Sequence, residues 1–301
     1  MGINIPVWAS CIFWGIAMLT TAVAGFGFIK ILNIISVPAL FVFLLYGLAT
    51  VLGNGGAAAV INYVPPVTNN LVFGITIVVG GFAAGAITSG DYNRYCKNAK
   101  DAALACVIGV LPSGIGIILI GAVLAISTGN YDITYMFASL GMPLFGMAVL
   151  ILATWTTNTG NAYSSGIAVV NLFKLRDEKR VIATLICGVL GIILSLGGII
   201  NQFVTFLSFL GVFIPPIAGV VIADYWILGK GNAKQWKPYE GVNWIGIISW
   251  IAGVAASYFS KFFIPILNGI IVSLVLYIIL MSVIKNSRMN PFVDLKEKIY
   301  E

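Results

Sequence analysis

The stretch LVFGITIVVGGFAAGAITSG, residues 71–90, combines the two properties that decide the fold of this chain. It contains no charged residue, and a helix of roughly 20 residues is what spans about 30 Å of hydrocarbon. Because backbone groups in lipid must be satisfied within the chain, the stretch predicts a transmembrane α-helix. Its centre also carries two adjacent glycines, a residue type that weakens helices.

Apolar stretches of similar length recur along almost all of the 301 residues. We expect nine transmembrane helices, at residues 6–27, 32–53, 69–90, 102–126, 136–172, 181–199, 201–228, 243–259 and 262–284. Charged residues make up 9% of the sequence and the mean hydropathy is +1.03, whereas about a quarter of a soluble domain is charged. Barrel strands would be shorter and alternate in polarity. The sequence therefore predicts an all-α polytopic membrane protein built as one integral membrane domain.

The basic residues predict the orientation of the helices. With nine crossings, fifteen of the sixteen Lys and Arg residues fall in links on one side, and Lys261 alone lies opposite. Since cytoplasmic links carry the positive excess, we expect the C-terminus, residues 285–301, to be cytoplasmic. This count explains the net charge of +6 without a nucleic-acid partner and places Met1 on the outer face, which we interpret as a sign that upstream helices are missing.

The segment Val78–Gly85 allows two interpretations. Its glycines permit backbone angles that unwind a helix, and transporters use such discontinuous helices to present bare backbone groups to a substrate. The alternative is a face of small residues against which another helix packs closely. Phe82 lies beside the glycines, where an aromatic ring suits the stacking of a flat heteroaromatic ligand, although a Phe in a membrane helix more often serves packing.

The segment Ala153–Gly166 is rich in Thr, Asn and Ser at a depth where polar side chains must point toward partners, water or an ion. Ala153, Thr156 and Thr157 follow helical i, i+3 and i+4 spacing, so their oxygens share one face. Neutral oxygens suit a hard monovalent cation such as sodium better than a transition metal. Hydrogen bonding between helices is the alternative.

Other chemistry has little support in the sequence. The four cysteines lack the spacing of metal ligands, and histidine is absent, so an enzyme nucleophile with a base is not indicated. Asp91 and Arg94 are spaced to pair locally. The acidic residues flank helices instead of forming a buried chain, which favours sodium over proton coupling.

Several blocks of sequence together resemble one family. They are Val79–Phe82 through Asp91, Arg94 and Lys97–Lys100; Trp155–Asn158 with Tyr163–Gly166; Phe206–Ser208 through Ile214–Pro216, Gly219 and Ile222–Tyr225; and Val37–Ala39. In this order they resemble the nucleobase-cation symporter family, and within it the bacterial cytosine permeases, over essentially the whole chain.

The resemblance implies a fold of twelve helices with two inverted repeats, like that of a bacterial leucine transporter. The chain would match the fourth to twelfth helices, with the first three absent and a discontinuous helix near residues 80–85. Residues 1–53 would be the remainder of the first repeat, 69–228 the second repeat, and 243–284 the two C-terminal helices.

The resemblance also implies the site residues. Phe82 would stack on the base, and Gly81, Ala84 and Gly85 would offer backbone groups. Asn158 and Asn161 would face the ligand, and the Ala153 carbonyl with the Thr156 and Thr157 hydroxyls would bind sodium. Cytosine permeases tend to have a serine matching Ala84 and an asparagine matching Ala153, so the exact base and ion ligands stay open.

The function expected from this resemblance is cation-coupled uptake, with sodium as the coupling ion or a proton as the alternative. The substrate would be cytosine or a related pyrimidine, carried across the cytoplasmic (inner) membrane without a cofactor. The alternatives are a transporter of the same fold for a purine, hydantoin, hydroxymethylpyrimidine or amino acid, and an inactive truncated fragment. The sequence leaves the oligomeric state open.

Overall fold

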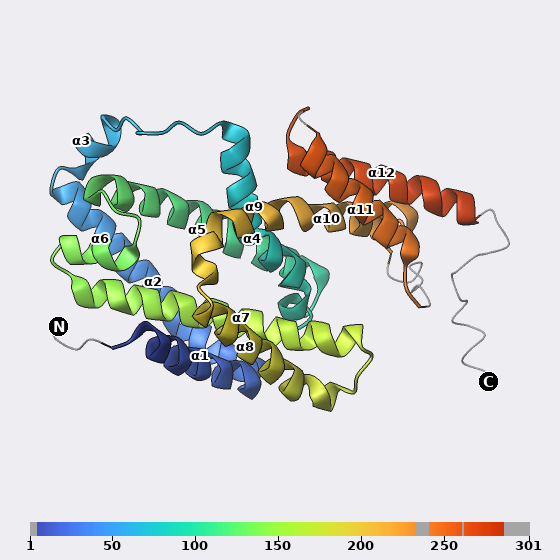
Figure 1. Cartoon of the computed structure of the whole chain (residues 1–301), viewed down its shortest axis with the longest axis horizontal. Coiled ribbons are helices and arrows are strands. Elements are labelled where there is room, and N and C mark those ends of the chain that lie inside the picture. The colour runs from blue at the N-terminus through green and yellow to red at the C-terminus, as the bar shows by residue number, and fades with distance from the viewer. Residues whose placement is uncertain (1–4, 233–240, 261, 286–301) are drawn as a thin grey trace. The chain divides into compact units, whose positions relative to one another are not determined.

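The computed structural model describes residues 5–232, 241–260 and 262–285, which form helices joined by short links and contain no strand (Figure 1). Two compact units are present. Unit 1 comprises Met1–Pro66 with Gly90–Ile200, and unit 2 comprises Val67–Ser89 with Asn201–Glu301. The predicted all-α architecture is confirmed, whereas Lys261 and the predicted tail after Lys285 lie outside the described residues.

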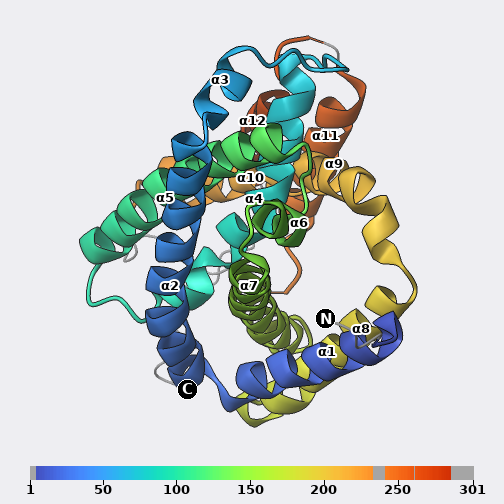
Figure 2. The same cartoon turned by 90° about the vertical axis from the view of Figure 1, so that its left-hand side faces the viewer.

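Three helices of unit 1, named below as α1, α7 and α8, pack on one another. Its elements are α1 (Val7–Ala24), α2 (Phe26–Gly53), α3 (Gly56–Ile61), the end of α4 (Leu71–Asn93), α5 (Ala99–Thr128), α6 (Ile133–Ser139), α7 (Pro143–Leu172), η1 (Asp177–Lys179) and α8 (Arg180–Leu196). Helices α1, α7 and α8 contact one another, and α1 and α8 lie side by side in Figures 1 and 2. At their crossing, Gly188 leaves room for the side chain of Leu19. A larger residue at this glycine would require the Leu19 side chain to move.

Unit 2 is organised around a pair of C-terminal helices. Its elements are the first part of α4, η2 (Ile199–Gln202) at the boundary, α9 (Phe203–Phe213), α10 (Pro215–Val221), the π-helix η3 (Ile222–Leu228), α11 (Trp244–Phe259) and α12 (Pro265–Lys285). Helices α11 and α12 pack together, and both contact α10. Pro215 and Pro216 lack the N–H groups that would continue the hydrogen bonds of α9. The Ile217 N–H bonds the Ile214 carbonyl, and the Phe213 carbonyl accepts a hydrogen bond from the Trp250 indole at 2.7 Å. The predicted span 201–228 is therefore helical but bent.

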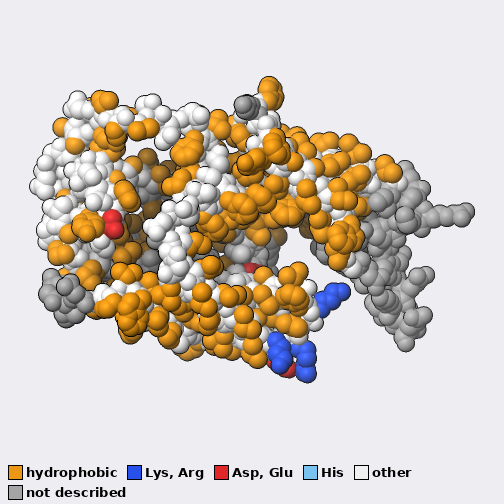
Figure 3. Space-filling model, in the orientation of Figure 1, with side chains coloured by type: hydrophobic (Ala, Val, Ile, Leu, Met, Phe, Trp, Pro, Cys, Tyr) orange, Lys and Arg blue, Asp and Glu red, His pale blue; other side chains and the backbone are white. Residues whose placement is uncertain are grey.

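The structure agrees with most of the expected spans and corrects one. Within the described residues, seven helices are long and apolar enough to cross a membrane. Helix α11 has 16 residues and α7 carries the polar segment, so crossing by these two stays a prediction. The expected span 136–172 is divided into α6 and α7, because Gly141 adopts a φ of 77° between them. Much of the surface seen in Figure 3 is apolar, as contact with lipid requires, and Lys and Arg gather where α7 leads into α8.

Helix α4 corrects a second expectation, because it runs without a break from Leu71 to Asn93. The interruption predicted near residues 80–85 is absent. Gly80 instead packs so tightly on α9 that a Cβ atom there would overlap the carbonyl oxygen of Leu207. On the facing helix, a Cβ at Gly211 would lie 2.7 Å from the carbonyl oxygen of Thr76. Gly80 therefore serves close helix packing, which is the alternative interpretation of this segment.

The packing at Gly80 is tested by two identical substitutions in α4. Gly80→Ala is expected to lower the free energy of unfolding by about 1–3 kcal/mol because the methyl group has no room. Gly74→Ala, where nothing lies within 4 Å of the added atom, is expected to be neutral or to stabilise by up to about 1 kcal/mol. Thermal unfolding in detergent measures both, and equal melting temperatures would contradict the tight crossing.

Asp132 caps α6 outside the apolar spans. Its carboxylate accepts hydrogen bonds from the hydroxyl and the backbone N–H of Thr134, the latter at 2.8 Å. The bond from the Thr134 hydroxyl is the main cause that lowers the pKa of Asp132 below 3.8. A group whose folded pKa is depressed stabilises the fold above its unfolded pKa, and that stability is lost as the pH falls through the folded value.

Asp132→Ala is therefore expected to lower stability by about 0.5–2 kcal/mol at neutral pH through loss of the cap. The difference from the parent protein should shrink as the pH falls below 3.8. Asp132→Asn keeps a capping oxygen without the charge and serves as the control. Melting temperatures across the acidic range test this, and a difference that does not change with pH would argue against it.

Candidate functional site

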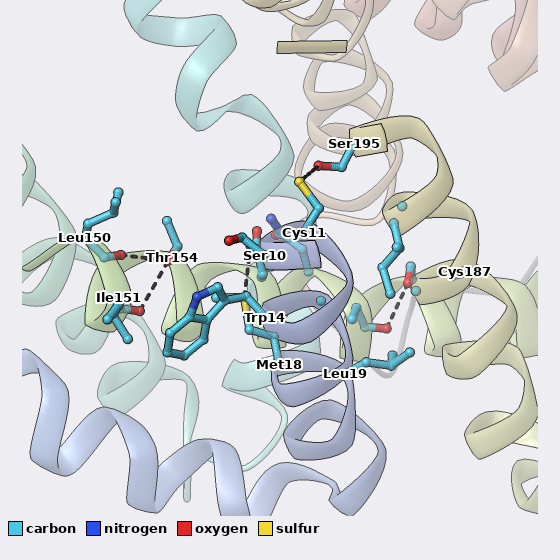
Figure 4. A pocket seen from close by; sticks show the side chains of 18 residues that line it. Ser10, Cys11, Trp14, Met18, Leu19, Leu150, Ile151, Thr154, Cys187 and Ser195 are labelled. Carbon is cyan, nitrogen blue, oxygen red and sulfur yellow. Dashed lines mark hydrogen bonds between the residues drawn. The ribbon is translucent and has the colours of Figure 1, made fainter. Parts of the chain in front are cut away.

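The polar segment of α7 borders a cavity of about 700 Å³ inside unit 1. Side chains of α1, α7 and α8 line it (Figure 4). On α7 the lining residues recur at helical spacing and form one stripe: Leu150, Ile151, Thr154, Asn158, Asn161, Ala162 and Ser165. Both asparagines predicted to face a ligand thus lie on the cavity face of α7.

Hydrogen bonds between α1 and α7 hold this stripe in place. The Trp155 indole donates to the Thr21 hydroxyl at 3.0 Å, and the buried Thr159 hydroxyl donates to the Met18 carbonyl at 3.3 Å. Because α7 turns these two residues toward α1, its neighbouring positions face the cavity. The polar segment therefore makes hydrogen bonds between helices, one of the two interpretations of its sequence, whereas its role in binding sodium stays a prediction.

The two carboxamides retain most of their hydrogen-bonding capacity. The Asn158 amide donates to the Met18 sulfur at 3.3 Å, and a thioether is a weak acceptor. Within the described residues, the Asn161 side chain has no hydrogen-bond partner, and both asparagines are exposed. A carboxamide offers a donor pair and an acceptor side by side, so these groups can read the edge of a small polar ring.

Trp14 is a cavity residue that sequence reasoning missed. It lies on α1 and meets the Trp155 ring edge-on, with ring centroids 5.9 Å apart. A tryptophan in an apolar helix carries no signal of its own, and its approach to α7 depends on tertiary packing. Its indole adds an aromatic surface to the cavity that holds Asn158.

The three predicted sodium ligands lie together on α7. The Thr156 hydroxyl donates to the carbonyl oxygens of Leu152 and Ala153, each at 3.0 Å, and Thr157 is exposed. Since the helix is continuous here, the Ala153 carbonyl also takes part in the backbone ladder. Of the three groups, the Thr156 hydroxyl and the Ala153 carbonyl are thus bonded to each other, and no cluster of His, Cys, Asp or Glu suited to a metal occurs in the described ranges.

The predicted residues of α4 form a separate group in unit 2. The Phe82 ring is 51% exposed and lies along its own helix, where a Cβ at Gly85 would be 3.4 Å from it. The carbonyls of Ala84 and Gly85 accept hydrogen bonds from the Thr88 hydroxyl at 3.1 and 3.4 Å, and Gly81 borders open space. The structure thus brings the α7 residues together and the α4 residues together, each within its own unit.

Known proteins resemble this chain along most of its length. A family described as permease for cytosine/purines, uracil, thiamine, allantoin matches residues 1–277. Among its relatives, the cytosine permease of Escherichia coli (strain K12) is 29% identical over 272 residues, covering 88% of this chain and 63% of the relative. The hydantoin permease of Microbacterium maritypicum is 26% identical over 320 residues, covering 91% and 62%.

A third relative, the uracil permease of Saccharomyces cerevisiae, is 23% identical over 211 residues, covering 59% of this chain and 33% of the relative. All three relatives are permeases and not enzymes, and the chain spans less than two thirds of their length. The family match extends over the helices from α1 to α11 and over most of α12. This chain is therefore a polytopic membrane protein that belongs to the family of permeases for cytosine and purines, uracil, thiamine and allantoin.

Proposed function

We propose that this chain forms part or all of a permease that carries cytosine or a related pyrimidine across the cytoplasmic membrane together with sodium. The observation that carries the proposal is the pair of exposed carboxamides, Asn158 and Asn161, on the cavity face of α7 in a chain of this family. Carboxamides match the alternating donors and acceptors on the edge of such a ring.

In this proposal the residues divide the work by chemical type. Asn158 and Asn161 hydrogen-bond the edge of the base, and Phe82 stacks on its face. Gly81, Ala84 and Gly85 contribute backbone groups. Because Thr88 occupies the carbonyls of Ala84 and Gly85 in the continuous helix, α4 would have to open locally before those oxygens could meet a substrate.

Sodium is proposed as the coupling ion, held by the Ala153 carbonyl and the hydroxyls of Thr156 and Thr157. The Thr156 hydroxyl already lies 3.0 Å from the Ala153 carbonyl, which supports a shared site. Its hydrogen points at that carbonyl, so the hydroxyl would rotate to turn a lone pair toward the ion. The cytoplasmic C-terminus belongs to the same proposal and rests on the distribution of basic links.

A second candidate substrate is another small cyclic amide. The hydantoin and uracil permeases among the relatives favour it, because those rings also alternate N–H and C=O groups along one edge. Competition between labelled cytosine and unlabelled hydantoin, uracil or purines distinguishes the candidates. An inactive fragment would bind none of them, with or without sodium.

Removing the carboxamides tests the substrate site. Asn158→Ala and Asn161→Ala are each expected to weaken cytosine binding about tenfold, the equivalent of one hydrogen bond of about 1.4 kcal/mol. Asn171→Ala, an exposed asparagine near the end of the same helix and away from the cavity, is the matched control. Equilibrium binding to the purified chain in nanodiscs measures all three, and unchanged binding in both cavity variants would contradict the site.

Sodium coupling is tested at Thr157. Thr157→Val removes the hydroxyl at nearly constant shape and is expected to raise the sodium concentration for half-maximal cytosine binding about tenfold. Thr50→Val, a threonine of α2 bonded to the carbonyl of Tyr46, is the control. If the parent protein binds cytosine equally in sodium and choline but responds to pH, proton coupling replaces the sodium proposal.

A further inference from the structure

A cluster of arginine and aromatic side chains joins four segments of unit 1 beside the cavity. It consists of Phe26 at the start of α2, Arg94 and Tyr95 in the link between α4 and α5, Tyr163 of α7 and Arg180 of α8. Tyr163 lies between Ala162 and Ser165, which line the cavity. The cluster therefore borders the α7 wall of the candidate site.

The phenol of Tyr163 is the centre of this cluster. It is 3% exposed, and its hydroxyl accepts a hydrogen bond from Arg94 Nη2 at 2.9 Å. The hydroxyls of Tyr163 and Tyr95 lie 3.0 Å apart, and Arg94 also donates to Tyr95 at 3.0 Å. The bond with Tyr163, followed by the hydrogen bond from Arg94 and its charge, lowers the pKa of Tyr95 below 10.0. Three polar groups of the link and α7 thus form a closed triangle.

Two further contacts connect the triangle to α2 and α8. The Tyr95 ring stacks on Phe26 with centroids 4.0 Å apart, and Phe26 follows Gly25, whose φ of 96° separates α1 from α2. The Arg180 guanidinium lies over the Tyr163 ring, 5.0 Å from its centroid. Its Nη1 atom is buried without a hydrogen-bond acceptor, which is consistent with the aromatic ring as its partner.

The cluster is not held by carboxylates. Within the described residues the ion pair that forms is Arg176 with Glu178, and the pair predicted between Asp91 and Arg94 is absent. Arg94 instead reaches a phenol on another helix, 69 residues away in the chain. Arg94 and Tyr95 are exposed, so water can hydrogen-bond to their side chains when they leave Tyr163. Tyr163 itself is buried.

We propose that the link Arg94–Asn98 is a latch that closes this end of unit 1 by binding Tyr163, and that it opens by releasing Arg94 and Tyr95 together. In the closed state the link ties the end of α4 to α7 and the start of α2. In the open state Arg94 and Tyr95 are hydrated, and Tyr163 keeps the Arg180 guanidinium. The latch belongs to the fold itself and does not depend on which substrate the chain carries.

Cys96, the residue after Tyr95, reports on the latch directly. The test uses the full chain with Cys11, Cys106 and Cys187 replaced by Ser, and measures the rate at which a hydrophilic maleimide modifies Cys96. Tyr163→Phe removes both hydroxyl bonds but keeps the ring for Arg180, and Arg94→Gln removes the donor. Both variants are expected to be modified at least threefold faster than the parent.

The control is Lys97→Gln, which removes a positive charge from the same link at a residue without a hydrogen bond or ion pair in the described structure. Loss of a nearby cation makes a thiol less reactive, so charge alone would slow modification in Arg94→Gln. Parent-like rates in both Tyr163→Phe and Arg94→Gln, or equal acceleration in Lys97→Gln, would overturn the latch. If Tyr163→Phe fails to give a monodisperse protein, Tyr95→Phe replaces it. This variant keeps the bond from Arg94 to Tyr163 and is expected to accelerate modification of Cys96. An unchanged rate in Tyr95→Phe would overturn the latch.

Discussion

The close approach of α4 and α9 at Gly80 follows from the physical chemistry of helices in hydrocarbon. In hydrocarbon, backbone N–H and C=O groups need partners within the protein, and helices gain little by burying apolar side chains against one another. Packing then depends largely on backbones that approach closely, which favours small residues such as glycine at the crossing points. Gly80 meets the carbonyl of Leu207, and Gly253 of α11 meets that of Gly269 of α12. Helices whose backbone groups are paired internally, and glycines where two helices cross closely, both follow from the hydrocarbon environment.

The same constraint explains which polar residues of α7 are available for binding. A threonine or serine has one hydroxyl hydrogen, and within a helix it can donate to a carbonyl of the preceding turn, as Thr154, Thr156 and Ser165 do. An asparagine has two donors and two acceptor positions, which its own helix does not satisfy in this way. On the cavity face of α7, Asn158 and Asn161 therefore keep polar groups that remain to be matched.

The sequence was a good guide to the apolar spans and a weaker guide to what interrupts or connects them. Composition and length located the segments because transfer into lipid depends on local hydrophobicity, and the polar stripe of α7 was visible for the same reason. The break at Gly141 and the continuity of α4 depend on backbone angles and on α9, which the local pattern does not encode. Trp14 and the contact of Arg94 with Tyr163 join residues far apart in the chain, and no spacing rule connects them.

Helix α7 presents different chemistry on different faces, and this arrangement links the cavity to the Arg94 cluster. Asn158 and Asn161 face the cavity, whereas Gly160 gives room to the Tyr92 hydroxyl and Tyr163 holds Arg94. Asn158 and Tyr163 are separated by five residues, or about 7.5 Å along a helix. Because a continuous helix moves as a rigid element over such a distance, a shift of α7 at the carboxamides displaces the phenol as well. Under the latch proposal, release of Arg94 and rearrangement of the cavity wall would therefore be connected through α7.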